Sequence, residues 1–330
     1  MDLVLLAAGE SSRYPAGKPK FLWTMPDGRL MIEHAIHPFV NQCNYIRVVI
    51  QQRHENDYHV SAILSKLYGS RLVLTILTHA TNGPAISAQA ALVNVPDVPV
   101  FIKDCDSIFH CILGSGNGIC VTDIGLDSSQ SYVVTDRNRV LGIAEKQPIS
   151  SQACAGGYLF ASSHQFNSTC AELHSESEIY VSHVIEQMLG TSEFGVVPVS
   201  DYIDLGNYEK FLAYADQHKT IFCDIDGVVV ENQSFYFSPS YYDKPVAILE
   251  NCAMLLELQR NGSDLIFTTA RPESVREITE HELRAIGFTD FKLIMGLKHG
   301  KRVLVNDYAA SNPYPSAIAI NVPRNGKFDI

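Results

Sequence analysis

The sequence predicts an α/β protein of two three-layer α/β/α domains, each with a doubly wound, mostly parallel sheet. Three observations lead to this prediction. Short apolar runs, long enough for one strand each, alternate with longer stretches that have the spacing of helices. Small or acidic residues follow several of these runs, where loops between strands and helices are expected. The length of 330 residues allows two domains.

Composition narrows the class of protein. Hydrophobic residues make up 46% of the chain and charged residues 18%, which is typical of a packed protein rather than a disordered one. Acidic residues outnumber basic residues by 36 to 25, and the net charge is −11. This charge argues against nonspecific binding of nucleic acid or of an anionic membrane. A phosphorylated substrate would therefore require local positive charge or a metal ion.

The cysteines and the apolar runs indicate the cellular compartment in which we expect the protein. The 8 cysteines form no CxxC pair and no cluster with zinc spacing, so we expect reduced, mostly buried thiols in a cytoplasmic protein. The segment Met1–Gly9 is apolar but lacks the basic and long apolar regions of a signal peptide. No apolar run reaches the roughly 20 residues of a membrane helix.

The first apolar run, Leu3–Leu6, leads into a loop of small residues. Such a loop brings backbone N–H groups close to a phosphate, and Arg13 and Lys20 add positive charge. The stretch LAAGESSR…GKPKFL resembles the N-terminal signature of nucleotidyltransferases that make nucleotide-activated sugars and alcohols, with Ser11-Ser12 in place of a second glycine. The resemblance implies that Arg13 and Lys20 hold a triphosphate and act in catalysis. It also implies nucleotide contacts from Ala7, Ala8 and Gly9. An ordinary turn with surface basic residues is the alternative.

Two later aspartates match the metal ligands of that family. The run Pro99–Lys103 reads as a central strand that leads to Asp104 and Asp106, and alternation places both carboxylates on one side. Asp204 lies in an aromatic-x-Asp-x-Gly motif about a hundred residues further on. The resemblance implies that Asp106 and Asp204 bind Mg²⁺, which needs few protein carboxylates because phosphates and waters complete its octahedron.

The same resemblance assigns the two substrates. It implies that Gly83, in a loop before a helix, contacts the nucleobase, and that Glu145 and Lys146 meet a phosphorylated acceptor near the glycine-bearing strand of Gly157. The alternatives are a plain helix N-terminus at Gly83 and an exposed ion pair at Glu145-Lys146. We expect an NTP and a phosphorylated sugar or polyol as substrates. The loop's general appearance favours CTP, but no residue fixes the base.

A second motif lies in the last third of the chain. Thr220–Val229 is an apolar run that ends in Asp224, Asp226 and Gly227, and alternation again points both carboxylates to one side. Thr269 follows the next expected strand, and a third expected strand, Arg302–Val305, leads to Asp307. This order resembles that of the haloacid dehalogenase-like (HAD) phosphohydrolases.

The HAD resemblance implies a role for each of these residues. Asp224 would be the nucleophile and Asp226 the general acid and base. Thr269 and a lysine, either Lys301 or Lys298 with a slight preference for Lys301, would hold the phosphoryl oxygens. A second Mg²⁺ would bind Asp224, Asp307 and the backbone of Asp226. We interpret the aromatic segment 230–245 as a short flap, or alternatively as a packed surface loop.

Together the two resemblances predict a bifunctional enzyme with Rossmann-like domains at residues 1–218 and 219–330, the second with a minimal cap. We expect nucleotidyl transfer and phosphomonoester hydrolysis as consecutive steps that supply capsule or surface-polysaccharide precursors. A phosphatase regulated by a noncatalytic nucleotide-binding domain is the alternative. The oligomeric state is left open.

Overall fold

The structure, a computed structural model, describes residues 1–123, 130–232, 246–307 and 317–329. The chain divides into two compact units, Met1–Lys210 (unit 1) and Phe211–Ile330 (unit 2). The division falls within α7 (Tyr208–Gln217), the helix at whose end the sequence places the domain boundary. Most of the expected flap, from residue 233 to 245, lies outside the described residues.

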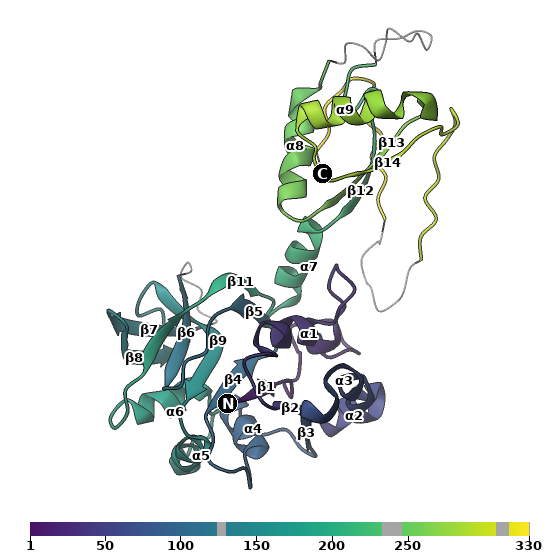
Figure 1. Ribbon diagram of the computed structural model, residues 1–330. Helices are drawn as coiled ribbons and strands as arrows, with labels where there is room; N and C mark the ends of the chain where they lie inside the picture. The colour runs from purple at the N-terminus through teal and green to yellow at the C-terminus, as the bar shows by residue number, and fades with distance from the viewer. Residues whose placement is uncertain (124–129, 233–245, 308–316, 330) are drawn as a thin grey trace. The chain divides into compact units, whose positions relative to one another are not determined.

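Unit 1 is organised around a nine-stranded sheet with the order β3-β2-β1-β4-β9-β6-β10-β8-β7 (Figure 1). Its strands are β1 (Asp2–Leu6), β2 (Ile46–Gln51), β3 (Leu72–Leu77), β4 (Val100–Asp104), β6 (Gly118–Asp123), β7 (Ser131–Asp136), β8 (Arg139–Glu145), β9 (Gln152–Phe160) and β10 (Gly195–Pro198). A separate antiparallel pair joins β5 (Ser107–His110) to β11 (Ser200–Asp204).

One half of this sheet is parallel, whereas the other half is mostly antiparallel apart from the parallel pair of β6 and β10. Strands β3, β2, β1 and β4 run in the same direction, whereas β9 is antiparallel to both β4 and β6. Beyond β6, the strands β8 and β7 form an antiparallel hairpin. The expectation of a mostly parallel sheet is therefore wrong for the second half, and unit 1 has a mixed α/β fold. Two-residue hairpin connections such as Arg137-Asn138 join antiparallel neighbours, whereas parallel strands need long crossovers.

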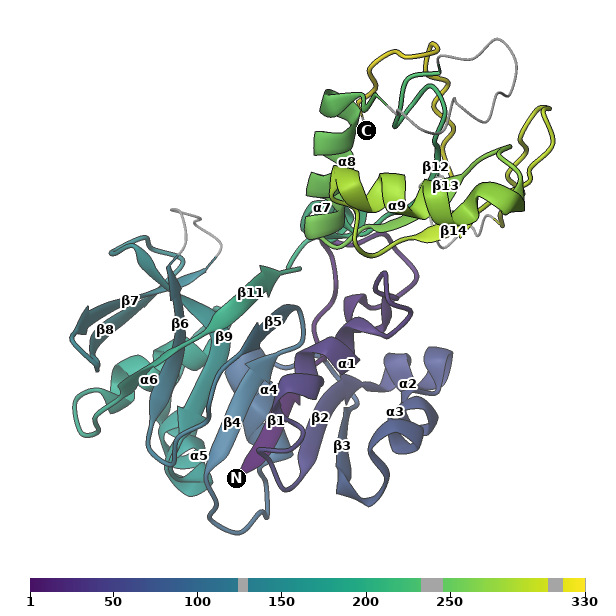
Figure 2. The same cartoon turned by 45° about the horizontal axis from the view of Figure 1, so that its top comes forward.

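Helices cover both faces of the sheet, as Figure 2 shows. One core packs β1 and β4 against α4, α5 and α6, and the other packs β1 and β2 against α1 and α3. The helices of unit 1 are α1 (Met31–Ile36), α2 (Gln52–Tyr58), α3 (Val60–Tyr68), α4 (Pro84–Ala91), α5 (Ser163–Glu172) and α6 (Val181–Met188). Short 3₁₀ turns lie at Lys20–Leu22, His37–Phe39 and Gly69–Arg71. The three-layer prediction thus holds for unit 1.

The topology of unit 1 brings the predicted site residues to one edge of the sheet. The ends of β1 and β4 are paired, with Leu6 opposite Asp104, so the loops that follow these strands begin side by side. On the β5–β11 pair, Asp204 lies opposite Ser107. Ligand sites in open α/β sheets form at the carboxyl ends of parallel strands, where these loops meet.

Unit 2 has a three-stranded parallel sheet, β12 (Thr220–Asp224), β13 (Asp264–Thr268) and β14 (Lys292–Ile294). Its core joins the sheet to the helices α8 (Leu249–Arg260) and α9 (Arg276–Ile286), which follows a 3₁₀ turn at Glu273–Val275. The expected strand Arg302–Val305 is not formed. Its apolar side chains are largely exposed, Val305 at 89%, so the burial that would favour a central strand is missing.

Within the described residues, no helix has the length and apolar character needed to cross a membrane.

Candidate functional site

Asp106 and Asp204 face a common point in unit 1. A Cβ placed on Gly206 would lie 3.0 Å from Asp204 Oδ1 and 3.5 Å from Asp106 Oδ2, with Arg13 Nη2 at 3.8 Å. The chain reaches this arrangement because Leu205 N donates to Asp106 O at 2.8 Å and Gly206 N donates to Asp204 Oδ1 at 2.8 Å. Arg13, Asp106 and Asp204, each about a hundred positions from the next, are therefore brought together.

Each of the two carboxylates is also paired with a lysine. Lys20 Nζ donates to Asp106 Oδ2, and Lys210 Nζ donates to Asp204 Oδ2 at 2.6 Å. Burial is the largest single influence and favours the neutral form of both members of the first pair, but the charges and hydrogen bond around them together outweigh it. As a result, the pKa of Asp106 lies below its ordinary value and the pKa of Lys20 lies above it. Lys210 was not predicted from the sequence, although it directly follows the Asp204 motif on α7.

Asp104 and Lys103 lie beside this pair in a more enclosed setting. Burial, followed by the negative charge of Asp106, raises the pKa of Asp104 to about 7. Burial lowers the pKa of Lys103 to about 8, against the attraction of Asp104 and Asp106. Lys103 is fully buried, and the sequence analysis placed it only as a strand residue.

The loop after β1 is fixed by side chains from α2 and its preceding strand. Gln51 Nε2 donates to Ala8 O at 2.6 Å and to Glu10 Oε1 at 2.9 Å, and Arg53 pairs with Glu10 at 2.6 Å. A Cβ on Gly9 would meet no atom within 4 Å. Ala7 is buried and Ala8 is partly buried, so Gly9 is the open part of the loop. The backbone at Gly9 is therefore open to solvent.

Gly83 begins α4 in a conformation that only glycine adopts easily. Its φ is +110°, and a Cβ there would lie 2.5 Å from Ile179 O. Ile179 N donates to Asn82 O at 2.9 Å, and Ala85 N donates to Ile179 O at 3.0 Å. Gly83 thus serves close packing between α4 and the segment before α6.

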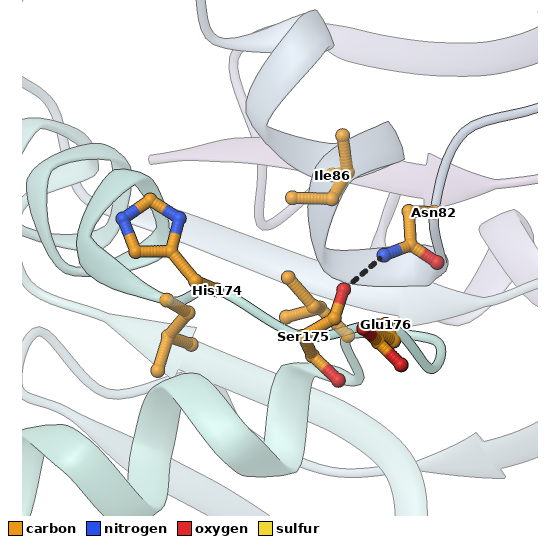
Figure 3. Close-up of a pocket in the computed structure, with 7 residues that line it drawn as sticks. Asn82, Ile86, His174, Ser175 and Glu176 are labelled. Atoms are coloured by element: carbon orange, nitrogen blue, oxygen red, sulfur yellow. Dashed lines mark hydrogen bonds between the residues drawn. The ribbon is translucent and has the colours of Figure 1, made fainter.

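An open cavity of about 550 Å³ lies beside this contact (Figure 3). In the figure, Asn82 Nδ2 donates to Ser175 O across one end of it, at 3.0 Å. The cavity is lined by Asn82, Ile86, Leu173, His174, Ser175, Glu176 and Ile179. Of the predicted site residues, Gly83 is the nearest in sequence, and none lines the cavity itself.

Glu145 and Lys146 are held by residues at the start of α6. Glu145 Oε2 accepts hydrogen bonds from Ser131 Oγ at 2.5 Å and Ser182 Oγ at 2.6 Å. Lys146 Nζ donates to Tyr180 OH at 2.5 Å and lies 4.2 Å from the centre of the Tyr180 ring. Lys146 Nζ lies 4.0 Å from Glu145 Oε1, so the two side chains also form a long ion pair in which Lys146 is the more exposed member. Tyr180 and Ser182 were missed because their contact with Glu145 and Lys146 depends on the tertiary fold.

Gly157 is closely packed on the side where a side chain would point. A Cβ at this position would lie 2.8 Å from Phe109 Cζ and 3.0 Å from Cys120 Sγ, and its place near the acceptor stays a prediction. Its neighbour Gly156, with φ of +80°, makes the close approach to the site, because its Cβ would lie 2.8 Å from Asp104 Oδ2 and from Ser107 Oγ. The alternation of side chains along β9 explains why adjacent glycines meet different surroundings.

In unit 2, Asp226 is engaged by residues at the end of β13. Arg271 Nη2 donates to Asp226 Oδ1 at 2.7 Å, and Thr269 Oγ1 donates to Asp226 Oδ2 at 3.0 Å. Arg271 is fully buried and also pairs with Glu282. Thr269 is likewise fully buried and accepts from Arg271 N. Arg271, two residues beyond Thr269, was not selected from the sequence although it belongs to the same strand-end motif.

Asp224 lies at the end of β12 and is more exposed than Asp226. Burial raises its pKa, and Arg302 opposes the shift from 3.2 Å away. The expected lysines, Lys298 and Lys301, are both exposed, and Arg302 is the cation that forms an ion pair with Asp224 in the described residues.

The two expected metal sites differ in fit. Among the residues that the structure describes, no three His, Cys, Asp or Glu side chains form a metal-binding group. The expected strand that would place Asp307 beside Asp224 is not formed, and Asp307 is exposed. The pair Asp106 and Asp204 fits Mg²⁺, which requires few protein oxygens when it binds phosphates.

Comparison with known proteins bears on the fold of unit 1. Residues 3–111 match the model of the MobA-like NTP transferase domain family. This match covers β1 to β5 and includes Gly9, Arg13, Lys20 and Asp106. No curated protein sequence matches the chain.

Solved structures of sugar-nucleotide enzymes resemble about two thirds of the chain. A nucleoside-diphosphate-sugar pyrophosphorylase from Vibrio cholerae RC9 is 16% identical, with a TM-score of 0.58 over 64% of this chain and 99% of that one. An inositol-1-phosphate CTP transferase from T. maritima is 14% identical, with a TM-score of 0.55 over 63% and 90%. A UDP-glucose pyrophosphorylase from Acinetobacter baumanii is 16% identical, with a TM-score of 0.51 over 64% and 90%. These likenesses show a nucleotidyltransferase-like fold.

Proposed function

We propose that residues 1–218 catalyse Mg²⁺-dependent nucleotidyl transfer from an NTP to a phosphorylated sugar or polyol, with release of pyrophosphate. The observation that carries the proposal is the convergence of Asp106 Oδ2, Asp204 Oδ1 and Arg13 Nη2 on one point above Gly206. The match of residues 3–111 to an NTP transferase model and the names of the structural neighbours support the same class of reaction.

The chemistry follows from the contacts. An oxygen of the acceptor phosphate attacks the α-phosphorus, the bond to the β-phosphate oxygen breaks, and pyrophosphate leaves with that electron pair. Asp106 and Asp204 would hold Mg²⁺, which would supply positive charge against the phosphates. Arg13 and Lys20 orient the triphosphate over the open backbone at Gly9, and positioning with charge neutralisation is the main source of catalysis in such transfers.

The acceptor is proposed to bind at Glu145 and Lys146. Lys146 supplies a cation for the acceptor phosphate, and Tyr180 orients this ammonium through its hydroxyl at 2.5 Å. Ser131 and Ser182 hold the Glu145 carboxylate, which can accept hydrogen bonds from sugar or polyol hydroxyls.

The test is pyrophosphate release from each of the four common NTPs with Mg²⁺ and a panel of sugar and polyol phosphates. We expect release with a strong preference for one NTP, CTP being our first choice, and only when an acceptor is present. Binding of an NTP without turnover of any acceptor would contradict transfer and favour the noncatalytic nucleotide-binding alternative.

We further propose that residues 219–330 hydrolyse a phosphomonoester with Asp224 as the nucleophile. Support comes from its place at the carboxyl end of a parallel strand, its partial exposure, and the cation of Arg302 at 3.2 Å. The carboxylate attacks phosphorus and the alcohol leaves; water then cleaves the acyl phosphate. A general-acid role for Asp226 requires exchange of its contacts with Arg271 and Thr269.

Free phosphate released from the same panel without NTP tests this second activity. Asp224→Asn should abolish this release, and an equal rate in the variant would exclude Asp224 as the nucleophile.

A further inference from the structure

A fully buried lysine lies directly beneath the proposed metal site. Lys103 is the fourth residue of β4, and the turn that follows it, Asp104–Ser107, carries Asp106. Its side chain is 0% exposed. A buried ammonium is costly unless its hydrogen-bond donors are satisfied, so such a residue is retained only where its contacts compensate for the loss of water.

Every donor of this lysine can be assigned. Lys103 Nζ lies 3.1 Å from Asp104 O, 2.5 Å from Ser107 O and 3.1 Å from Ser107 Oγ. The two carbonyl oxygens can only accept, and an ammonium has three N–H groups to give. The nitrogen also lies 4.5 Å from the centre of the Phe109 ring, whose face favours a cation.

These contacts close the turn at both ends. Asp104 O belongs to the first residue of the turn and Ser107 O to the last, so one ammonium fixes the ends between which Asp106 is held. Gly156 on β9 packs against the same turn, because a Cβ added to it would lie 2.8 Å from Asp104 Oδ2 and from Ser107 Oγ. Lys20, by contrast, meets the carboxylate of Asp106 itself.

We propose that Lys103 is a positioning residue that fixes the Asp104–Ser107 turn and thereby the direction in which Asp106 presents its carboxylate. The inference rests on the proposed transferase function of unit 1. Lys103 contacts neither substrate. It acts through hydrogen bonds to the backbone of the turn, in the way that hydrogen-bonding partners commonly orient metal ligands.

The experiment compares Lys103→Met with the wild type in pyrophosphate release over a range of Mg²⁺ concentrations. Methionine keeps an unbranched chain of similar length and removes the ammonium. We expect kcat to fall and the Mg²⁺ concentration for half-maximal rate to rise, each by roughly 10- to 100-fold, as is typical of residues that orient metal ligands. The KM for NTP should change little, because the Gly9 loop is held by Gln51 and not by Lys103.

Hydrogen exchange supplies a readout that does not need activity. Peptides covering residues 104–110 should exchange faster in Lys103→Met, whereas peptides covering the Gly9 loop should not. Lys66→Met, an exposed lysine on α3, is the matched control and should leave both readouts unchanged.

A graded variant covers the outcome in which Lys103→Met fails to fold. Ser107→Ala removes one of the three acceptors and leaves both carbonyls, so it should shift the Mg²⁺ dependence in the same direction by a smaller factor. Unchanged Mg²⁺ dependence and unchanged exchange in the folded variant would overturn the proposal. If the wild type releases no pyrophosphate, the transferase proposal fails, and the exchange data alone decide whether Lys103 holds the turn.

Discussion

The two units contain the same spacing of aspartates, Asp104-x-Asp106 in unit 1 and Asp224-x-Asp226 in unit 2, and use it differently. In unit 1 the second aspartate meets Lys20 and faces Asp204, while the first is packed against Gly156. In unit 2 the second aspartate is held by Arg271, while the first is the more exposed one. The spacing of two aspartates at a strand end therefore does not decide which carboxylate is available to bind a ligand. The position of the neighbouring cation and the burial of each carboxylate decide it.

The largest expected effect concerns the carboxylates of unit 1. Asp106→Asn keeps an acceptor for Lys20 but removes the charge proposed to bind Mg²⁺. Pyrophosphate release should fall by about 10²–10³-fold, the range seen when one electrostatic contact to the reacting phosphates is lost. Steady-state kinetics measure this loss, and Asp57→Asn, an exposed aspartate on α2, is the control. A normal rate of pyrophosphate release in Asp106→Asn would contradict the proposed role of this carboxylate and therefore the contrast between the two aspartate pairs.

A stability measurement sharpens the contrast with unit 2. Arg271→Met leaves Asp226 and Glu282 without their buried guanidinium, which should cost about 3–5 kcal/mol. The only tryptophan, Trp23, lies in unit 1, so its fluorescence follows unfolding of that unit, whereas circular dichroism follows both. We expect part of the unfolding transition followed by circular dichroism to move to milder conditions, while the midpoint followed by Trp23 fluorescence stays unchanged, since each unit has its own core. Equal shifts by both probes would contradict this.

A pH dependence is expected from His54 in unit 1. Burial lowers the pKa of this side chain from 6.5 to about 4. Because the folded-state pKa is depressed, its contribution to stability is fully present above pH 6.5 and is lost as the pH falls towards 4. The loss is about 3 kcal/mol at most, since each pKa unit corresponds to about 1.4 kcal/mol. Denaturation of the wild type and His54→Gln at several pH values measures it, and the variant should show a flatter profile. Parallel profiles would exclude His54 as the cause.

The smallest effect concerns two glycines. Gly9→Ala should fold normally because nothing lies within 4 Å of the new Cβ, yet it should raise the KM for NTP by roughly tenfold through a weakened backbone contact to phosphate. Gly156→Ala should instead lower stability, because its φ is +80° and Asp104 and Ser107 crowd the position. Kinetics and denaturation of both variants separate an open ligand loop from close packing. Loss of stability in Gly9→Ala would contradict the assignment.

The sequence indicated which residues meet at the sheet edge but not how the strands pair. Asp106, Asp204 and Arg13 were selected through their resemblance to nucleotidyltransferase motifs, and the fold brings them together. The antiparallel half of the sheet could not be foreseen, because β9 is buried along nearly its whole length and such a strand fits either direction.

The sequence analysis missed the residues that contact and position the predicted site residues. In the sequence, Lys103 is simply a polar residue near the end of a strand. Only the fold shows that its ammonium donates to two backbone carbonyls. Tyr180, Lys210 and Arg302 approach the site residues only through tertiary contacts. The expected strand at residues 302–305 rested on apolar composition alone, and its side chains find no burial.

The most direct test of the account is a crossed measurement of pyrophosphate and phosphate release in three proteins, the wild type, Asp106→Asn and Asp224→Asn. Each is assayed with the preferred NTP and the panel of sugar and polyol phosphates. We predict that Asp106→Asn loses only pyrophosphate release and that Asp224→Asn loses only phosphate release. Loss of both products in either variant would contradict the assignment of separate activities to the two units.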